Sequence, residues 1–507
     1  MTSPHRLVIV GNGMAGARLA ENVLARKDDR PFEIVMFGEE PGGTYNRILL
    51  SGVLAGTHAG PDIVTNPVEW YGANGILLHS STRVDGIDLD LRSISDARRL
   101  REPFDSLVLA TGSRPVLPPI EGLVHADGSL PRGVFVFRTV EDCAHMAVAA
   151  SEARRAVVIG GGLLGLEAAR GLLGQGIDVA VVHLGPHLMD TQLDSAAGRI
   201  LQRQIERMGI DAHVATTTTR VHAGPQLHEI EFSSGLRLEC DLLVVAAGVR
   251  PNVRLAEGCG LHVARGIVVG DDLQCAGARG VYAIGDCAEH RGEVYGLVGP
   301  AWEQADVLAD RLTGRRPEAL YRGSRPATKL KVAGLDVAVM GERDPVDDDE
   351  VITYSEPSRG IYGRVIVRND RIEGAILVGA AHAVPLIVQR FLDRSAAPEQ
   401  RAELLFPQTG DGPARPVNEI PDTARICDCN AVSKQQIVEA VLNGAASVRA
   451  VCERTRASTG CGSCKPEVQR IVDSVCREMV DAPAPRGGGG ARSQQAAAST
   501  GDHHAEP

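Results

Sequence analysis

Residues 7–21 read LVIVGNGMAGARLAE, and this stretch decides the fold. A short apolar run stops at Gly11, and glycines recur at Gly13 and Gly16 before a helix-forming segment. In this spacing the first glycine allows a sharp turn, the second lets backbone approach a pyrophosphate, and the third lets the helix pack on the strand. The helix then presents free N–H groups and its positive dipole end to the phosphates. The stretch predicts a strand, turn and helix that bind a dinucleotide.

The next predicted strand, residues 32–37 (FEIVMF), ends just before a pair of acidic residues. In dinucleotide-binding folds an acidic side chain about 20 residues beyond the glycines accepts the ribose hydroxyls. Glu39 is our preferred candidate for this role, and Glu40 is the alternative. Taken alone, the glycine spacing would also suit a glycine-rich turn in another α/β fold.

A second unit of the same kind follows about 150 residues later. Residues 156–159 (AVVI) run into Gly160, Gly162 and Gly165, and Glu167 lies on the predicted helix. The following strand, 178–182, ends at His183, where many NAD-specific sites carry an acid. Two such units in one chain indicate two dinucleotides.

Each unit closes on an apolar strand with a small polar turn, ATGSRP (110–115) and GVRPN (248–252). A further predicted strand over residues 280–286 carries Asp286, whose carboxylate can accept hydrogen bonds from a sugar-alcohol chain. We expect this strand to complete the first unit. Pro300 is expected at the first position of the next helix, whose positive end would stabilise an anionic ring.

Length and composition limit the class of protein. The chain has 507 residues, enough for about three domains, and its net charge of −11 argues against nucleic acid or an anionic membrane as partners. We find no apolar segment long enough to cross a bilayer and no signal-peptide pattern. Six of the eleven cysteines lie in the last ninety residues, which fits a cytoplasmic protein with one local metal site better than a disulfide framework.

That local site is predicted from two close cysteine pairs, Cys427-x-Cys429 and Cys461-x-x-Cys464, with 31 residues between them. Four thiolates select an iron–sulfur cluster, zinc or copper(I), and zinc is the structural alternative. We interpret Cys452 and Cys476 as structural thiols.

Three other segments complete the organisation. The stretch YNRILLS (45–51) places Asn46 and Arg47 where they contact an anionic cofactor or simply begin a helix, and it lacks the redox cysteine pair of flavin disulfide reductases. Residues 325–400 mix predicted strands (329–334, 365–367 and 375–378) with a helix near 385–392. The Pro- and Gly-rich composition of segment 407–424 predicts a linker, and residues after about 480 have the composition of a disordered tail.

Together, several motifs resemble one family. These are GNGMAG (11–16), YNRILLS (45–51), ATGSRP (110–115), GGGLLGLEAARGL (160–172), VVHLGPHLM (181–189), QLD (192–194), GVRPN (248–252), GDCAEHRG (285–292) and TKLKV (328–332). Over residues 1 to about 400 they resemble the flavoprotein half of NAD(P)H nitrite reductase large subunits and the electron-transfer subunits of assimilatory nitrate reductases. The cysteine spacing is similar to the [2Fe-2S] domain of bacterioferritin-associated ferredoxins (BFD).

The resemblance implies an α/β fold with two interleaved Rossmann-like FAD- and NAD(P)-binding domains of the pyridine nucleotide-disulfide reductase type, a small α+β domain and a small helical BFD-like module. The expected boundaries are 1–120 with 246–322 for FAD, 121–245 for NAD(P), 323–405 for the α+β domain, 406–424 for the linker, 425–479 for the module and 480–507 for the tail.

The resemblance also implies which residues hold the cofactors. Those expected to line FAD are Gly11, Gly13, Gly16, Glu39, Asn46, Arg47, Thr111, Gly112 and Asp286. Those expected at NADH or NADPH are Gly160, Gly162, Gly165 and Glu167, with His183 at the ribose position. The cluster would be held by Cys427, Cys429, Cys461 and Cys464, and no side chain is named as catalytic.

The implied activity is electron transfer from NAD(P)H through FAD and a [2Fe-2S] cluster to a molybdenum-dependent nitrate reductase catalytic subunit or another redox protein. Because only Cys476 follows Cys464, we expect no sirohaem site and no reduction of nitrite by this polypeptide itself. The alternative hypotheses are a ferredoxin or rubredoxin reductase, a reductase component for a separate nitrite reductase, and an iron- or redox-sensing binding protein. A homo-oligomer is compatible with each reading.

Overall fold

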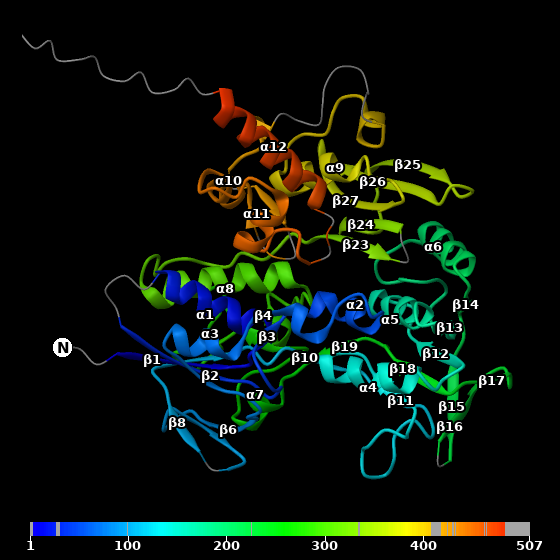
Figure 1. Ribbon diagram of the computed structural model, residues 1–507, viewed down its shortest axis with the longest axis horizontal. Helices are drawn as coiled ribbons and strands as arrows, with labels where there is room; N and C mark the ends of the chain where they lie inside the picture. The colour runs from blue at the N-terminus through cyan, green and yellow to red at the C-terminus, as the bar shows by residue number, and fades with distance from the viewer. Residues whose placement is uncertain are drawn as a thin grey trace, which may run out of the picture.

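The computed structural model describes residues 4–26, 31–98, 100–224, 226–332, 335–406, 417–422, 424–427, 430, 432–460, 462 and 464–481. Of the predicted metal ligands, Cys429 and Cys461 therefore lie outside the described residues. Figure 1 shows two sheets side by side in the lower half of the molecule, with the segments 327–378 and 425–481 above them.

The first sheet is parallel throughout, with the strand order β21-β9-β1-β2-β5. Its strands are β1 (His5–Val10), β2 (Phe32–Phe37), β5 (Ile76–His79), β9 (Ser106–Leu109) and β21 (Val281–Ala283). The helices α1 (Met14–Arg26) and α8 (Val298–Thr313) share its hydrophobic core. Strand β21 pairs with β9, so the additional strand predicted from the sequence completes this sheet.

The second sheet repeats this plan with the order β11-β18-β12-β13-β14, again parallel. Its strands are β11 (Val134–Val136), β12 (Arg155–Ile159), β13 (Asp178–Val182), β14 (Ile210–His213) and β18 (Leu242–Val245). The helices α4 (Val140–Ala150), α5 (Leu163–Leu173) and α6 (Ser195–Arg207) and an antiparallel sheet of β15 (Thr218–Ala223), β16 (Leu227–Phe232) and β17 (Arg237–Glu239) accompany it.

The central strands are continuous apolar runs because both faces of the sheet are covered. Along β12, Val158 packs in the core that contains the helices, whereas Val157 packs in the core formed with β15 and β16. Alternate side chains of a strand point to opposite faces, so a strand buried on both sides has no polar position.

The remaining elements of this part are short. They are β3 (Thr44–Tyr45), α2 (Leu50–Leu54), β4 (Val64–Asn66), α3 (Val68–Ala73), β6 (Val84–Asp88), β7 (Ser93–Asp96), β8 (Arg101–Pro103), α7 (Arg254–Gly258), β20 (Ile267–Val269) and β22 (Ala288–His290). Strands β6 to β8 form an antiparallel sheet, and β20 pairs with β22.

The two sheets are joined by a ribbon of two crossing segments. Strand β10 (Ser113–Pro115), which leaves the first sheet, pairs antiparallel with β19 (Val249–Pro251), which returns from the second. Thr111 Oγ1 donates to the Asn252 carbonyl at 2.7 Å, and the Asn252 N–H donates to the Gly112 carbonyl at 2.9 Å. The equivalent turns of the two units are therefore hydrogen-bonded to each other.

Above the second sheet lies an antiparallel sheet in the order β23-β24-β27-β26-β25, with α9 (Val384–Asp393) in its core. Its strands are β23 (Ala327–Val332), β24 (Leu335–Gly341), β25 (Glu350–Glu356), β26 (Ile361–Arg368) and β27 (Arg371–Val378). The predicted α+β character is confirmed, but the sequence analysis missed β24 and β25. Strand β25 lies at the sheet edge with half of its residues exposed, so its apolar signal is weak.

The cysteine module contains a hairpin of β28 (Arg425–Cys427) and β29 (Val432–Ser433), followed by α10 (Lys434–Leu442), α11 (Val448–Thr455) and α12 (Lys465–Asp481). The Ser433 side chain accepts from the Gln436 N–H, and Gln436 caps in return, as the capping-box pattern requires. Ile437, Val451 and Val468 from the three helices meet in one core. Within the described residues, no helix combines the length and apolarity needed to cross a bilayer.

Asp194 ties the antiparallel sheet to the second parallel sheet. Its carboxylate caps α6 by accepting from the Ala196 and Ala197 N–H groups, and it also accepts from Tyr362 and Arg364 of β26. Burial opposes ionisation, but these hydrogen bonds hold the pKa of Asp194 below its ordinary value. The stabilisation is present above the pKa of an unfolded aspartate, roughly 4, and is lost as the pH falls through the lower folded value.

We therefore expect Asp194→Ala to lower the free energy of unfolding at neutral pH by about 1–2 kcal/mol, the usual cost of a lost helix cap. Asp194→Asn keeps a capping oxygen and should lose less. Urea unfolding at pH 7 and at pH 4 measures both. Equal stability of Asp194→Ala and the parent at pH 7 would contradict this role.

Candidate functional site

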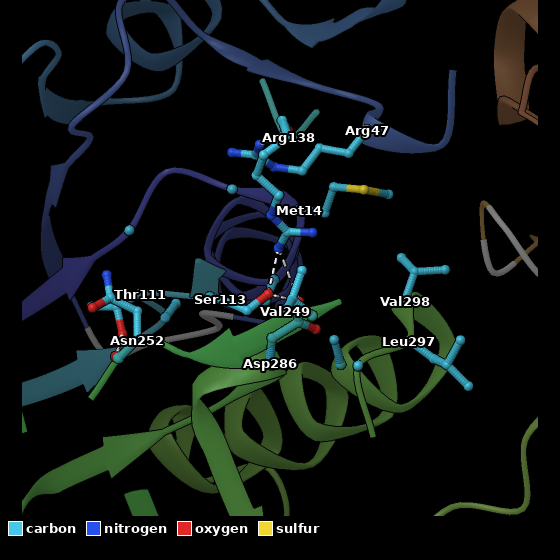
Figure 2. Close-up of a pocket in the computed structure, with 18 of the residues that line it drawn as sticks. Met14, Arg47, Thr111, Ser113, Arg138, Val249, Asn252, Asp286, Leu297 and Val298 are labelled. Carbon is cyan, nitrogen blue, oxygen red and sulfur yellow. Dashed lines mark hydrogen bonds and ion pairs between the residues drawn. The ribbon is translucent and has the colours of Figure 1, made fainter. Parts of the chain in front are cut away.

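One continuous groove, with a volume of about 1410 Å³, runs between the carboxyl ends of the two parallel sheets. Its walls come from the turn after β1, the β10–β19 ribbon, the beginning of α5 and the beginning of α8. Figure 2 shows side chains from both units, among them Arg47, Arg138 and Asp286, directed into this groove. Ligands of open α/β sheets bind at these strand ends.

The three glycines of the first turn have three separate duties. Gly11 has a φ of +117°, and a Cβ there would lie 2.1 Å from the Ala110 carbonyl oxygen. A Cβ on Gly16 would lie 2.1 Å from the Gly11 oxygen, so helix α1 packs closely on the turn. A Cβ on Gly13 would meet no described atom within 4 Å, and Gly13 lines the groove. The turn therefore leaves an open cradle beside a helix N-terminus, which fits a pyrophosphate.

The second turn repeats this geometry almost atom for atom. Gly160 has a φ of +120° and its Cβ would lie 2.2 Å from the Ala246 oxygen, while a Cβ on Gly165 would lie 1.9 Å from the Gly160 oxygen. Gly162 faces open space among the described atoms, and it caps α5 without a side-chain hydrogen bond. The first turns of α1 and α5, both fully described, contain no acidic residue. Both helix ends can therefore accept a phosphate.

A polar network lies where the two units meet. Asp286 follows β21, and its Oδ2 accepts from Ser113 Oγ at 2.7 Å and from Arg138 Nη2 at 3.1 Å. Arg138 Nη2 also donates to Ser113 Oγ at 2.6 Å. Arg47 donates to the Arg138 carbonyl at 2.9 Å and pairs with Glu40. Asp286, Arg47, Thr111 and Gly112 thus all line the groove, and Figure 2 shows the first three of them around it.

The structure separates the two acidic candidates at the end of β2. Glu40 is engaged with Arg47 and with the Tyr45 hydroxyl. Glu39 lines the groove, its side chain is 64% exposed, and it makes an ion pair with Arg83 at 3.6 Å. Glu39 is therefore the more exposed of the two carboxylates, and its role at a ribose stays a prediction.

Asn46 and His183 lie outside the groove lining. Asn46 is buried and its Oδ1 accepts from the Ile48 N–H, so the helix-start interpretation describes its contact. His183 accepts from the Gly161 N–H on Nδ1 at 3.2 Å and lies 3.0 Å from Asp190 through Nε2. Both ring nitrogens of His183 are thus engaged within the protein, and the roles of these two residues at a cofactor stay predictions.

Glu167 is one of the titratable groups that reach the groove from the second unit. It lies on α5 one turn beyond Gly162, and no described residue lies within hydrogen-bond or ion-pair distance of its carboxyl. Burial raises the pKa of Glu167 to about 7, and the charge of Arg170 only partly offsets this. Glu167 therefore changes charge near neutral pH at the junction of the two nucleotide sites.

Of the predicted cluster ligands, Cys427 and Cys464 are described, and both are buried in the core of the cysteine module. Cys427 ends β28, and Cys464 directly precedes α12. Cys452 lies near them on α11: burial first, and the neighbouring Cys427 second, raise the pKa of its thiol. Soft sulfur donors on a small helical scaffold suit an iron–sulfur cluster.

The helix that follows the first sheet approaches the groove with its N-terminus. Leu297, Val298, Gly299 and Pro300 all line the groove. Pro300 is the third residue of α8 and not the first, so the sequence prediction was wrong by two positions. The first four N–H groups of a helix have no intrahelical partner, so proline costs no hydrogen bond there.

Sequence reasoning missed several groove residues. Arg138 contacts both Ser113 and Asp286, and the nearest sequence signal is the Thr139–Asp142 capping box directly after it. Lys329 and Arg425 also reach the groove, although they come from the antiparallel sheet and the cysteine module. No local pattern shows that these distant segments fold onto the same groove.

The fold and the groove define a reductase with two dinucleotide sites and an attached iron–sulfur module. Residues 5–305 match the family model described as pyridine nucleotide-disulphide oxidoreductase, and the chain belongs to this family. Residues 326–390 match the rubredoxin NAD+ reductase C-terminal domain, and residues 425–474 match the BFD-like [2Fe-2S] binding domain. The chain is thus an NAD(P)H-dependent flavoprotein oxidoreductase whose cofactors are FAD and a [2Fe-2S] cluster.

Individual relatives agree with this assignment. The NAD(P)H nitrite reductase of Bacillus subtilis (strain 168) is 40% identical over 484 residues, covering 94% of this chain and 59% of that protein. The assimilatory nitrate reductase electron transfer subunit of the same organism is 38% identical over 481 residues, covering 95% and 61%. The chain therefore spans about three fifths of these relatives. A ferredoxin reductase structure from Rhodopseudomonas palustris aligns with a TM-score of 0.70 at 27% identity, covering 79% of this chain and 98% of that one.

The paired glycines give a prediction that separates packing from phosphate approach. Gly165→Ala places a methyl group against the Gly160 oxygen and should lower the free energy of unfolding by about 1–3 kcal/mol. Gly162→Ala should change stability by only a few tenths of a kcal/mol but weaken coenzyme binding by about tenfold, the worth of one charge-assisted hydrogen bond. Thermal unfolding and coenzyme titration measure the two effects. Unchanged binding in Gly162→Ala would show that the coenzyme lies elsewhere.

Proposed function

We propose that the chain passes electrons from NAD(P)H through FAD and the [2Fe-2S] cluster to a separate redox protein of nitrate assimilation, with assimilatory nitrate reductase as the first candidate. One observation carries the proposal: the groove lined by the first nucleotide turn and by the start of α5 extends to Arg425, two residues before the predicted cluster ligand Cys427. The module thus contributes a side chain to the groove, and Figure 1 shows its helices above α8.

The residues divide between the three sites. In our assignment, the first sheet holds FAD through Gly11, Gly13, Gly16, Glu39, Arg47, Thr111, Gly112 and Asp286. The second sheet holds the coenzyme through Gly160, Gly162, Gly165 and Glu167. The cluster is assigned to Cys427, Cys429, Cys461 and Cys464, of which the first and last are described. We place the protein in the cytoplasm, where NAD(P)H is available.

A bound flavin supplies the conversion between a two-electron hydride donor and a one-electron cluster. The protein's own residues provide orientation and charge. Arg138 and Ser113 hold the Asp286 carboxylate through Oδ2 and so fix its orientation. The N-terminus of α8 directs its positive end at the groove and favours a negatively charged ring there.

Glu167 should impose a pH dependence on coenzyme oxidation. Loss of hydride leaves a positive charge on the nicotinamide ring of the substrate, and an ionised carboxylate nearby stabilises it. The rate constant for flavin reduction should therefore rise from about pH 6 to about pH 8, with an inflection near the Glu167 pKa of about 7. Stopped-flow measurement with NADH and NADPH gives the profile. In Glu167→Gln the inflection should vanish, and its persistence would assign it to another group.

The module should be separable from the flavin site by mutation. Cys464→Ser replaces a soft thiolate by a poor iron ligand and should remove the iron and the transfer to protein acceptors, while FAD stays bound. Cys476→Ser, on the same helix but outside the predicted ligand set, is the matched control and should keep its iron. Iron content, flavin content and acceptor assays report the outcome. Loss of flavin together with iron would contradict modular sites.

The partner is tested by reconstitution. Purified chain, NADH or NADPH, and the molybdenum-containing catalytic subunit should together reduce nitrate, whereas omission of either protein should stop turnover. Rubredoxin, ferredoxin and a separate nitrite reductase serve as competing acceptors. A rubredoxin or ferredoxin acceptor is the second candidate, supported by the match of residues 326–390 and by the ferredoxin reductase alignment. Faster turnover with either of these than with nitrate reductase would favour that alternative, and no turnover with any acceptor would favour a sensor.

A further inference from the structure

Two arginines connect the cysteine module to the flavin-binding half. Arg425, on β28, pairs with Glu303 of α8 at 3.2 Å and lines the groove. Arg456, at the end of α11, pairs with Glu21 of α1 at 3.2 Å and donates to the Thr65 carbonyl at 3.0 Å. The two pairs thus fasten the module to both helices that cover the first sheet.

The acidic partners are themselves fixed. Glu303 accepts from Ser324 Oγ at 2.6 Å through its other oxygen. Glu21 accepts from Asn66 Nδ2 at 2.9 Å and pairs with Arg18 at 3.5 Å. Side chains that are already held lose little freedom on pairing, so these pairs define a position better than two mobile surface charges would.

Arg456 occupies a backbone position that favours glycine. Its φ is +61°, the left-handed conformation at a helix C-terminus, where glycine or asparagine is usual. An arginine there is strained. Two contacts offset this strain. The Arg456 guanidinium pairs with Glu21 of α1, and the Arg456 backbone carbonyl accepts from Asn430 Nδ2 at 2.6 Å.

We propose that Arg425–Glu303 and Arg456–Glu21 form a salt-sensitive latch that holds the cysteine module on the flavin groove and positions the cluster to receive electrons. The electron-transfer part of this inference rests on the proposed function. The docking of the cysteine module on the flavin-binding half does not depend on that function. Arg425 precedes Cys427 by two residues and Arg456 precedes Cys461 by five, so the latch acts next to both cysteine pairs. Arg425 and Arg456 are positioning residues in this account.

The protein contains its own optical reporter of the latch. Both of its tryptophans, Trp70 and Trp302, line a small pocket that Arg456 and Asn430 of the module also line. The Trp302 ring is 6% exposed. Release of the module would admit water to this pocket and shift tryptophan emission to longer wavelength.

The test compares Arg456→Glu, Glu21→Arg and the double reversal Arg456→Glu/Glu21→Arg in the full holoprotein. Each single variant should shift the tryptophan emission to the red and slow cluster reduction by NADH about tenfold, since small misplacements of reacting groups carry penalties of this order or more. The double reversal should restore both. Raising the salt concentration from about 0.05 M to about 0.5 M should shift the parent in the same way, because the Debye length shortens several-fold.

Two further variants serve as controls, one for backbone strain at residue 456 and one for the change of charge on α11. Arg456→Gly removes the side chain but relieves the backbone strain, so it should fold at least as well as the parent and still release the module. Arg449→Glu changes the same charge on the exposed side of α11, where Arg449 pairs with Glu453, and should behave as the parent. Flavin reduction by NADH should be unchanged in all of these variants.

Parent-like emission and parent-like cluster reduction in Arg456→Glu and Arg456→Gly would overturn the latch. Failure of the double reversal to restore either signal would overturn the pairing. If NADH reduces no cluster even in the parent, the proposed electron path fails, while the tryptophan shift still decides whether the latch exists.

Discussion

The pairing of β10 with β19 is the constraint on which the rest of the structure depends. In each parallel sheet one strand, β1 or β12, is followed by a glycine turn, and each turn could bind a nucleotide without the other. The antiparallel ribbon hydrogen-bonds the closing segments of the two sheets, and Thr111 and Asn252 fasten its end. The turn after β1 and the first residues of α5, the helix that follows the second turn, therefore line one groove. Transfer of hydride between two bound dinucleotides requires such an arrangement.

The same ribbon places the polar network. Ser113 begins β10 and holds Asp286 of the first unit, while Arg138, which precedes α4 of the second unit, contacts both. The groove wall is thus made jointly by two sheets whose sequences are far apart. These partly buried groups hold one another in place, because each member would lose its partners if it moved.

Much of this could be predicted from the sequence, because the determining signals are local. The glycine spacing predicts the turns because the third glycine of each turn packs directly on the first, and the apolar runs predict strands buried on both faces. The choice between Glu39 and Glu40 needed the structure, since only the fold shows that Glu40 is held by Arg47. Asn46 illustrates the opposite case, in which a motif residue mainly caps a short helix.

The contributions that escaped prediction are long-range. Arg138 and Arg425 carry no motif, and they reach the groove only because separate domains fold against it. The position of the cysteine module depends on one glutamate of α1 and one glutamate of α8. No sequence pattern in these helices distinguishes the two glutamates from the other charged residues. The family matches place the two parts in the same order along the chain, the oxidoreductase at residues 5–305 and the [2Fe-2S] module at residues 425–474.

We propose that this single chain accepts electrons as hydride and releases them one at a time through its cysteine module. The decisive measurement is electron paramagnetic resonance of the anaerobic holoprotein, frozen after addition of NADH or NADPH. We expect the signal of a reduced [2Fe-2S] cluster, together with bleaching of the flavin. A bleached flavin with no cluster signal, or a module that contains zinc in place of iron, would contradict it.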